Sequence, residues 1–116
     1  MNDRLNEVID EPVSGLSYRV RPRKEGGEGA APCLLLLHGV GANETGFIEL
    51  ARAMDPRLTV LLVRAPLVLA PGRFAWFEVS FTPSGPAINP AQAESSRRRL
   101  QQFIGQLPVA CLTIVS

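Results

Sequence analysis

Apolar side chains alternate with polar ones near the start of the chain. Leu16, Tyr18 and Val20 are apolar, and the residues between them are polar. This period of two predicts a half-buried strand that pairs antiparallel with its neighbour. Residues 33–37 and 58–63 are instead apolar almost without interruption. Short continuous runs of this kind favour central strands that helices cover on both faces.

Two helices are predicted from apolar residues at spacings of three and four. The first stripe consists of Phe47, Leu50, Ala51 and Met54. The second stripe consists of Leu100, Phe103, Ile104 and Leu107. Asn89 suits the N-cap of the second helix, Pro90 its first position and Gln92 its capping-box position. Pro108 ends this helix, and residues 109–115 are predicted to form a third buried strand.

The order strand, helix, strand, helix, strand predicts an α/β fold. Its sheet is expected to be mostly parallel after an antiparallel N-terminal strand. Residues 67–90 contain several prolines and are predicted to form an irregular excursion, with a short strand around residues 76–81. Residues 1–15 are interpreted as a polar N-terminal tail, and residues 16–116 as part of a single α/β domain.

Charge and composition argue against several classes of function. The chain has 12 basic and 11 acidic residues and a net charge of +1, so nothing indicates a nucleic-acid partner. Its one basic run, residues 97–99, would fan around a helix and form a solvated face. No apolar run approaches the roughly 20 residues of a membrane span, and no secretory signal is visible, which predicts a cytoplasmic protein. Cys33 and Cys111 are interpreted as reduced core residues.

A glycine-rich turn lies between the first buried strand and the first helix, where α/β proteins place ligand-binding groups. A dinucleotide-binding loop would need a glycine at the position that Glu44 occupies. A phosphate-binding loop would need Lys and then Ser or Thr after Gly46, but Phe47 follows. The turn therefore matches neither kind of nucleotide site.

A third chemistry fits the same turn. A His-Gly sequence at the end of a strand can present a backbone N–H to the oxyanion that forms during acyl transfer. Glycines on either side of Val40 allow the backbone a close approach. We therefore predict an oxyanion hole in which Val40 N–H is the donor, supported by His38, Gly39 and Gly41.

Residues 34–44 read Leu-Leu-Leu-Leu-His-Gly-Val-Gly-Ala-Asn-Glu, and Phe47 and Leu50-Ala51 follow. Ala65-Pro66 comes after the next strand, and residues 72–78 read Gly-Arg-Phe-Ala-Trp-Phe-Glu. Together these segments resemble the start of the bacterial phospholipase/carboxylesterase family of α/β-hydrolases, which contains the acyl-protein thioesterases. The similarity covers roughly residues 16–107.

The resemblance implies an α/β-hydrolase fold that hydrolyses small acyl esters or thioesters without a cofactor or metal. In chain order, such enzymes use a serine at a Gly-x-Ser-x-Gly elbow, an aspartate and a histidine. The resemblance also places residues 72–78 beside the acyl site, which makes Trp76 and Phe77 candidate substrate-binding residues. Ordinary packing of these rings onto the sheet is an equally open interpretation. Arg73 is expected to be a solvated charge.

The catalytic triad is not recognisable in this chain. It contains no Gly-x-Ser-x-Gly sequence, and the terminal Ser116 is not assigned as a nucleophile. His38 is the one histidine, and it is expected to brace the turn by hydrogen bonding, because the family's base comes from much later in the chain. With two dispersed cysteines, one histidine also argues against a zinc site. The sequence therefore predicts a partial α/β-hydrolase sheet, truncated before the nucleophile elbow.

Three interpretations of the function stay open. The chain is a truncated carboxylesterase that is inactive as a separate chain, a non-catalytic acyl-binding module, or one piece of a split hydrolase. In the isolated chain, the outer edge of the last strand would expose unpaired backbone groups and favour self-association. The residues concerned are Val109, Leu112, Ile114 and Val115.

Overall fold

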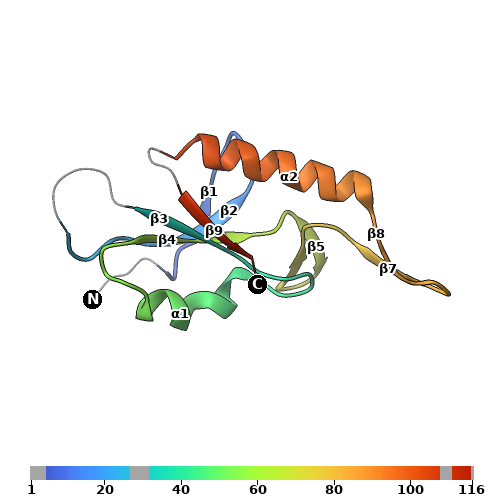
Figure 1. The fold of residues 1–116 in the computed structure, drawn as a ribbon, viewed down its shortest axis with the longest axis horizontal. Helices are drawn as coiled ribbons and strands as arrows, with labels where there is room; N and C mark the ends of the chain where they lie inside the picture. The colour runs from blue at the N-terminus through green and yellow to red at the C-terminus, as the bar shows by residue number, and fades with distance from the viewer. Residues whose placement is uncertain (1–4, 27–31, 108–110, 116) are drawn as a thin grey trace.

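The computed structural model describes residues 5–26, 32–107 and 111–115. Five strands form the main sheet in the order β1-β2-β4-β3-β9, with one helix on each face (Figure 1). In chain order these strands are Ile9–Asp10, Ser17–Arg21, Cys33–Leu37, Thr59–Arg64 and Cys111–Val115. The helical elements are η1 (Glu44–Phe47), α1 (Ile48–Ala53) and α2 (Pro90–Gly105).

The apolar run of β3 is explained by burial on both faces. All five of its residues are buried, and it lies between β4 and β9. Leu35 belongs to the core cluster that contains Phe103 of α2, whereas its neighbour Leu34 belongs to the cluster that contains Ala51 of α1. The prediction of a central strand covered on both sides is confirmed.

The expectation of a mostly parallel sheet is not met. In the described part of the chain, β3 pairs parallel with β4 and β9, but β2 pairs antiparallel with β1 and β4. The excursion adds two antiparallel hairpins (Figure 1). They pair β5 (Leu67–Ala70) with β6 (Arg73–Ala75), and β7 (Val79–Thr82) with β8 (Gly85–Ile88). Connections of two residues can join only antiparallel strands, and the alternation in these short segments is too brief to recognise in the sequence.

The first helical segment is shorter than the apolar stripe indicated. Ala51 is buried and Met54 packs against the same cluster, but Leu50 is 47% exposed. Successive residues lie about 100° apart on a helix, so a six-residue helix that buries Ala51 turns Leu50 away from the core.

The polar face of β2 is covered rather than solvated. Arg21 is fully buried, although its place in the alternation with Val20 indicated an outward side chain. Its guanidinium donates four hydrogen bonds of 2.6–2.9 Å to backbone carbonyls at the end of α1 and before β4. The acceptors are Ala51, Met54, Asp55 and Leu58. Arg21 therefore acts as a C-terminal cap for α1, whose last carbonyls have no partner within the helix.

Helix α2 begins where the sequence predicted. Asn89 Oδ1 accepts a hydrogen bond of 3.1 Å from Gln92 N–H, and Pro90 is the first helical residue. The Gln92 side chain does not close a capping box. It accepts from Glu78 N–H at 2.8 Å and donates to the Glu78 carboxylate at 2.7 Å, which ties the helix to the preceding excursion.

Replacing Asn89 with alanine is expected to lower the free energy of unfolding by about 1 kcal/mol, because the cap hydrogen bond is lost. Urea unfolding followed by circular dichroism measures this. Asn89→Ser is the matched control, since serine also caps, and it should cost less than Asn89→Ala. Equal losses in the two variants would contradict the capping role.

The apolar stripe and the solvated basic run predicted for α2 are confirmed, but the helix ends at Gly105, and Pro108, which was predicted to end it, lies outside the described residues. Phe103 is buried, Leu100 and Ile104 pack against its cluster, and residues 97–99 are exposed.

At the N-terminal end of the described chain, Leu5 is fully buried in the cluster on the α1 side. β1 pairs there with β2.

Cys33 is buried and forms no disulfide, as predicted. Val109 and Ser116, which entered the sequence predictions, lie outside the described residues.

Candidate functional site

The chain turns sharply between the end of β3 and η1. Gly41 N–H donates to Phe74 O at 2.8 Å, and Ala42 N–H donates to Gly39 O at 3.2 Å. Val40 N–H has no acceptor among the described residues, and its side chain is 40% exposed. The Val40 N–H is therefore a free donor just after a central strand, whereas the N–H groups of the next two residues, Gly41 and Ala42, are both hydrogen-bonded.

Gly41 is favoured by its backbone conformation, and the end of the Arg73 side chain lies close to it. Its φ is +84°, in the left-handed region that favours glycine. A Cβ atom there would lie 2.9 Å from Nη2 of Arg73. The Arg73 side chain, read from the sequence as a solvated charge, is exposed but also donates from Nε to Gly41 O at 3.0 Å.

Gly41→Ala is expected to lower the free energy of unfolding by about 2 kcal/mol, of which about 1 kcal/mol or more is left-handed backbone strain. Gly72→Ala is the matched control, because Gly72 has φ +72° but open space where its Cβ would lie. Urea unfolding should therefore show a smaller loss for Gly72→Ala. A loss at Gly41 no larger than that at Gly72 would show that the contact with Arg73 contributes nothing.

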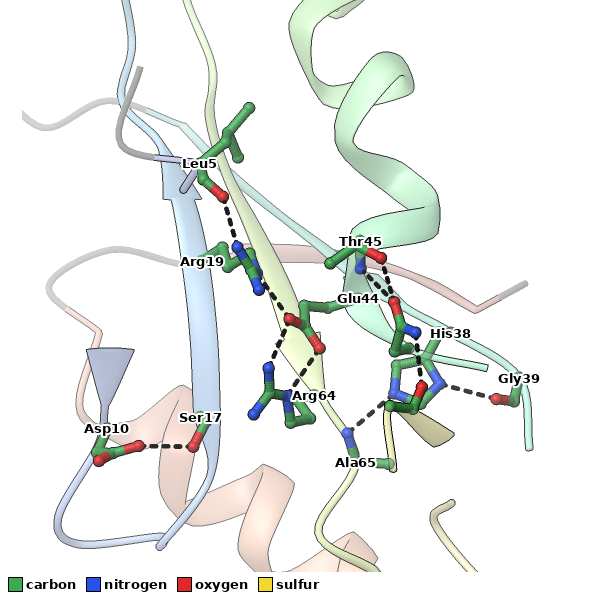
Figure 2. A network of polar contacts seen from close by, with 12 residues as sticks. Leu5, Asp10, Ser17, Arg19, His38, Gly39, Glu44, Thr45, Arg64 and Ala65 are labelled. Atoms are coloured by element: carbon green, nitrogen blue, oxygen red, sulfur yellow. Dashed lines mark hydrogen bonds and ion pairs between the residues drawn. The ribbon is translucent and has the colours of Figure 1, made fainter. Parts of the chain in front are cut away.

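His38 braces the turn with both of its ring nitrogens (Figure 2). Nε2 accepts a hydrogen bond of 3.0 Å from Ala65 N–H, and Nδ1 lies 2.7 Å from Gly39 O. Since Nε2 is an acceptor, Nδ1 carries the proton and donates to the carbonyl. His38 is also only 2% exposed, and both of its ring nitrogens are already engaged by backbone groups. The arrangement fits a structural brace and not a general base.

Trp76 is a second brace. Its Nε1–H donates to His38 O at 2.8 Å, and the two rings lie 5.8 Å apart between centroids. Its own carbonyl accepts a hydrogen bond of 2.5 Å from Ser96 Oγ in α2. Asn43, farther along the turn, donates from Nδ2 to Gly72 O at 2.7 Å. The segment 72–76 thus holds the turn at several points along its length.

Two cavities lie near the turn. Val40 lines one of them, and Trp76 and Phe77 line the other, although all three were predicted to belong to one site. One, of about 270 Å³, is walled by Trp76 and Phe77 with Leu37 and residues of α2. The other, of about 370 Å³, contains Val40. Its remaining lining residues are Gly41, Leu69, Arg73, Glu78, Val79 and Phe81. Trp76 and Phe77 therefore do not line the cavity of the free N–H. No pattern in the sequence pointed to Leu69, Val79 and Phe81, which do.

Glu44, two residues after Ala42, is fully buried. Arg64 donates to its two carboxylate oxygens at 2.8 and 3.0 Å, and Arg19 donates at 2.6 Å. Burial alone would raise the pKa of Glu44, but the hydrogen bonds from Arg64 and Arg19 outweigh it and lower this pKa to about 2. In the sequence, Glu44 served only to exclude a nucleotide loop, and no local pattern predicted this ion-pair cluster.

The described residues contain no group of three or more His, Cys, Asp or Glu side chains placed to hold a metal ion. No helix in the described ranges is long and apolar enough to span a bilayer.

Comparison with known proteins gives one informative similarity. No protein-family model matches the chain, and no curated protein matches it. Among solved structures, it is similar to the crystal structure of a carboxylesterase from Mesorhizobium loti, with a TM-score of 0.65 and 25% sequence identity. The similarity covers 86% of this chain and 44% of that one, so the chain spans less than half of its length. The chain therefore has a carboxylesterase-like partial α/β fold.

Proposed function

We propose that this chain carries the oxyanion-binding part of a carboxylic ester or thioester hydrolase, with Val40 N–H as the donor. The observation that carries the proposal is this N–H, which has no acceptor among the described residues. In a fold similar to that of a carboxylesterase, a donor of this kind can stabilise the negative charge that develops on a carbonyl oxygen.

The chemistry assigns a limited role to these residues. When a nucleophile attacks an ester carbonyl, the C=O electron pair moves to oxygen, and a prepositioned N–H at about 2.7–3.1 Å stabilises that charge. The cavity beside Val40 adds apolar surface from Leu69, Val79 and Phe81 for an acyl group. The one histidine of this sequence is engaged as a brace, and no Gly-x-Ser-x-Gly is present. The proposal therefore places the nucleophile and base on polypeptide outside these 116 residues.

A tetrahedral anion tests the donor without a nucleophile. We expect pentylphosphonate, titrated into the ¹⁵N-labelled chain, to shift the Val40 amide proton downfield to saturation, because it mimics the charged tetrahedral intermediate. Val40→Ala keeps the N–H and should bind within about twofold of the parent, whereas Val40→Pro should lose about 10- to 100-fold, the value of one hydrogen bond to a charged group. The chain alone should hydrolyse p-nitrophenyl esters no faster than background.

Other outcomes decide against the proposal. If Val40→Pro binds the phosphonate as well as Val40→Ala does, Val40 N–H is not the donor. If pentanol binds as tightly as pentylphosphonate, the cavity recognises only the alkyl chain, and the chain is a non-catalytic acyl-binding module. Ester turnover that Ser116→Ala abolishes would show that the chain carries its own nucleophile.

A further inference from the structure

We propose that Arg64 and Phe74 are positioning residues for the turn that carries Val40, and that Glu44 holds them in place. This inference rests on the function proposed above, because it explains how a single backbone N–H is kept in one orientation. None of these side chains needs to touch a substrate. Each acts through the next, along a path of contacts from the buried carboxylate to the backbone of the turn.

The first contact fixes the plane of the Arg64 guanidinium. Its Nε and Nη2 donate to Glu44 at 2.8–3.0 Å, one to each carboxylate oxygen. This two-point pairing sets the orientation of the guanidinium as well as its position. Arg19, which belongs to β2, contacts the same carboxylate from the other side, with its Nε 2.6 Å from Glu44 Oε2 (Figure 2). Because the Glu44 side chain is only 1% exposed, solvent does little to weaken the pairing.

The second contact joins this guanidinium to β6. Its central carbon lies 4.6 Å from the centroid of the Phe74 ring, within the range of a cation–π interaction. An arginine whose plane is held by Glu44 offers Phe74 a fixed surface, whereas a freely rotating one would not. The ring of Phe74 is thereby anchored to the end of β4.

The third contact passes from Phe74 to the turn through the backbone. Phe74 O accepts from Gly41 N–H at 2.8 Å, and Phe74 N–H donates to Ala42 O at 2.9 Å. These bonds hold the two residues that directly follow Val40. Glu44 itself lies two residues farther along, so the path returns to the segment from which it began. A shift of the Phe74 ring would move the backbone that orients Val40 N–H.

Amide hydrogen exchange of the full chain tests the path at its last step. Phe74→Leu removes the ring but keeps the backbone bonds, and Arg64→Lys keeps the charge but loses the planar two-point pairing. We expect each variant to speed exchange at Gly41 and Phe74 by about two- to fivefold, the equivalent of one exposed cation–π contact. The double variant should exchange no faster than the faster single variant, since both remove the same contact. Pentylphosphonate affinity should fall by less than this factor, because the opened turn stays a minor population and the binding-competent fraction changes little.

Asn89→Ala is the control, because it destabilises α2 and, in the described part of the chain, Asn89 forms no hydrogen bond with Glu44, Arg64, Phe74 or the turn. It should leave exchange at Gly41 and Phe74 unchanged relative to other sheet amides. If Phe74→Leu and Arg64→Lys act no differently from this control, or if their effects multiply in the double variant, the positioning role is wrong. If the parent chain binds no phosphonate, the proposed function fails, but the exchange rates still decide whether Arg64 and Phe74 position the turn.

Discussion

Arg21→Ala is expected to lower the free energy of unfolding by about 3–5 kcal/mol, which is a large share of the stability of a small domain. The guanidinium is fully buried and donates to four backbone carbonyls. Two of these, on Met54 and Leu58, have no other donor among the described residues. Alanine would leave these two partly buried carbonyls without a protein donor and would open a cavity between β2 and the end of α1.

Arg21→Met separates hydrogen bonding from packing. Methionine fills much of the same space without donating, so its cost should be about 2–3 kcal/mol, smaller than that of alanine. Urea unfolding, followed by Trp76 fluorescence and by circular dichroism, measures both variants. A methionine variant as stable as the parent would show that these carbonyls lose nothing when the arginine is absent.

Glu44→Ala is expected to cost about 3 kcal/mol. Removing one partner of a buried ion pair leaves the other charge uncompensated, and here two arginines lose their carboxylate. The loss is tempered because the side chains of Arg19 and Arg64 are 15% and 26% exposed and can recover some hydration. Glu44→Gln keeps the shape and one acceptor oxygen, and it should cost less than alanine.

The pH dependence of unfolding provides a second measurement of Glu44. Its pKa falls from the ordinary 4.5 to about 2 in the folded protein, so the folded state binds fewer protons in this window. The stabilisation from Glu44 should be complete above about pH 4.5 and should disappear as the pH falls towards 2. The difference in stability between the parent and Glu44→Gln should therefore shrink over this interval. A constant difference would contradict the assignment.

The sequence predicted the strands and helices well where one face had to be apolar. The β3 run, the start of α2 and the burial of Phe103 all follow from hydrophobic spacing and cap chemistry, which act over a few residues. Of the hairpin strands in the excursion, only β7 overlaps a predicted strand, the one around residues 76–81. The others were missed because they are three or four residues long and mostly exposed. Alternation over so few positions carries little information.

Polar residues with buried roles were the main gap. In a sequence, Arg21 looks like any outward-facing residue of an alternating strand. Its role depends on where α1 ends in space, and Glu44 likewise depends on arginines from β2 and β4. Such pairings are separated by 20 to 37 residues, so no local pattern reveals them. Hydrogen bonding by His38 was predicted, but its partner Ala65 was not, because Ala65 follows a different strand, β4.

The braces on the Val40 turn have a consequence for synthesis of the chain on the ribosome. The hydrogen bond between Trp76 and His38 spans 38 residues. At about 5–20 residues per second, translation needs roughly 2–8 s to deliver the tryptophan after the histidine has been added. During this interval the nascent β3 strand is present without the segment that fixes the turn beyond it. The turn around Val40 can therefore reach its final geometry only after residues 72–76 have been added. The N-caps of the helices, in contrast, can form as soon as their own residues emerge.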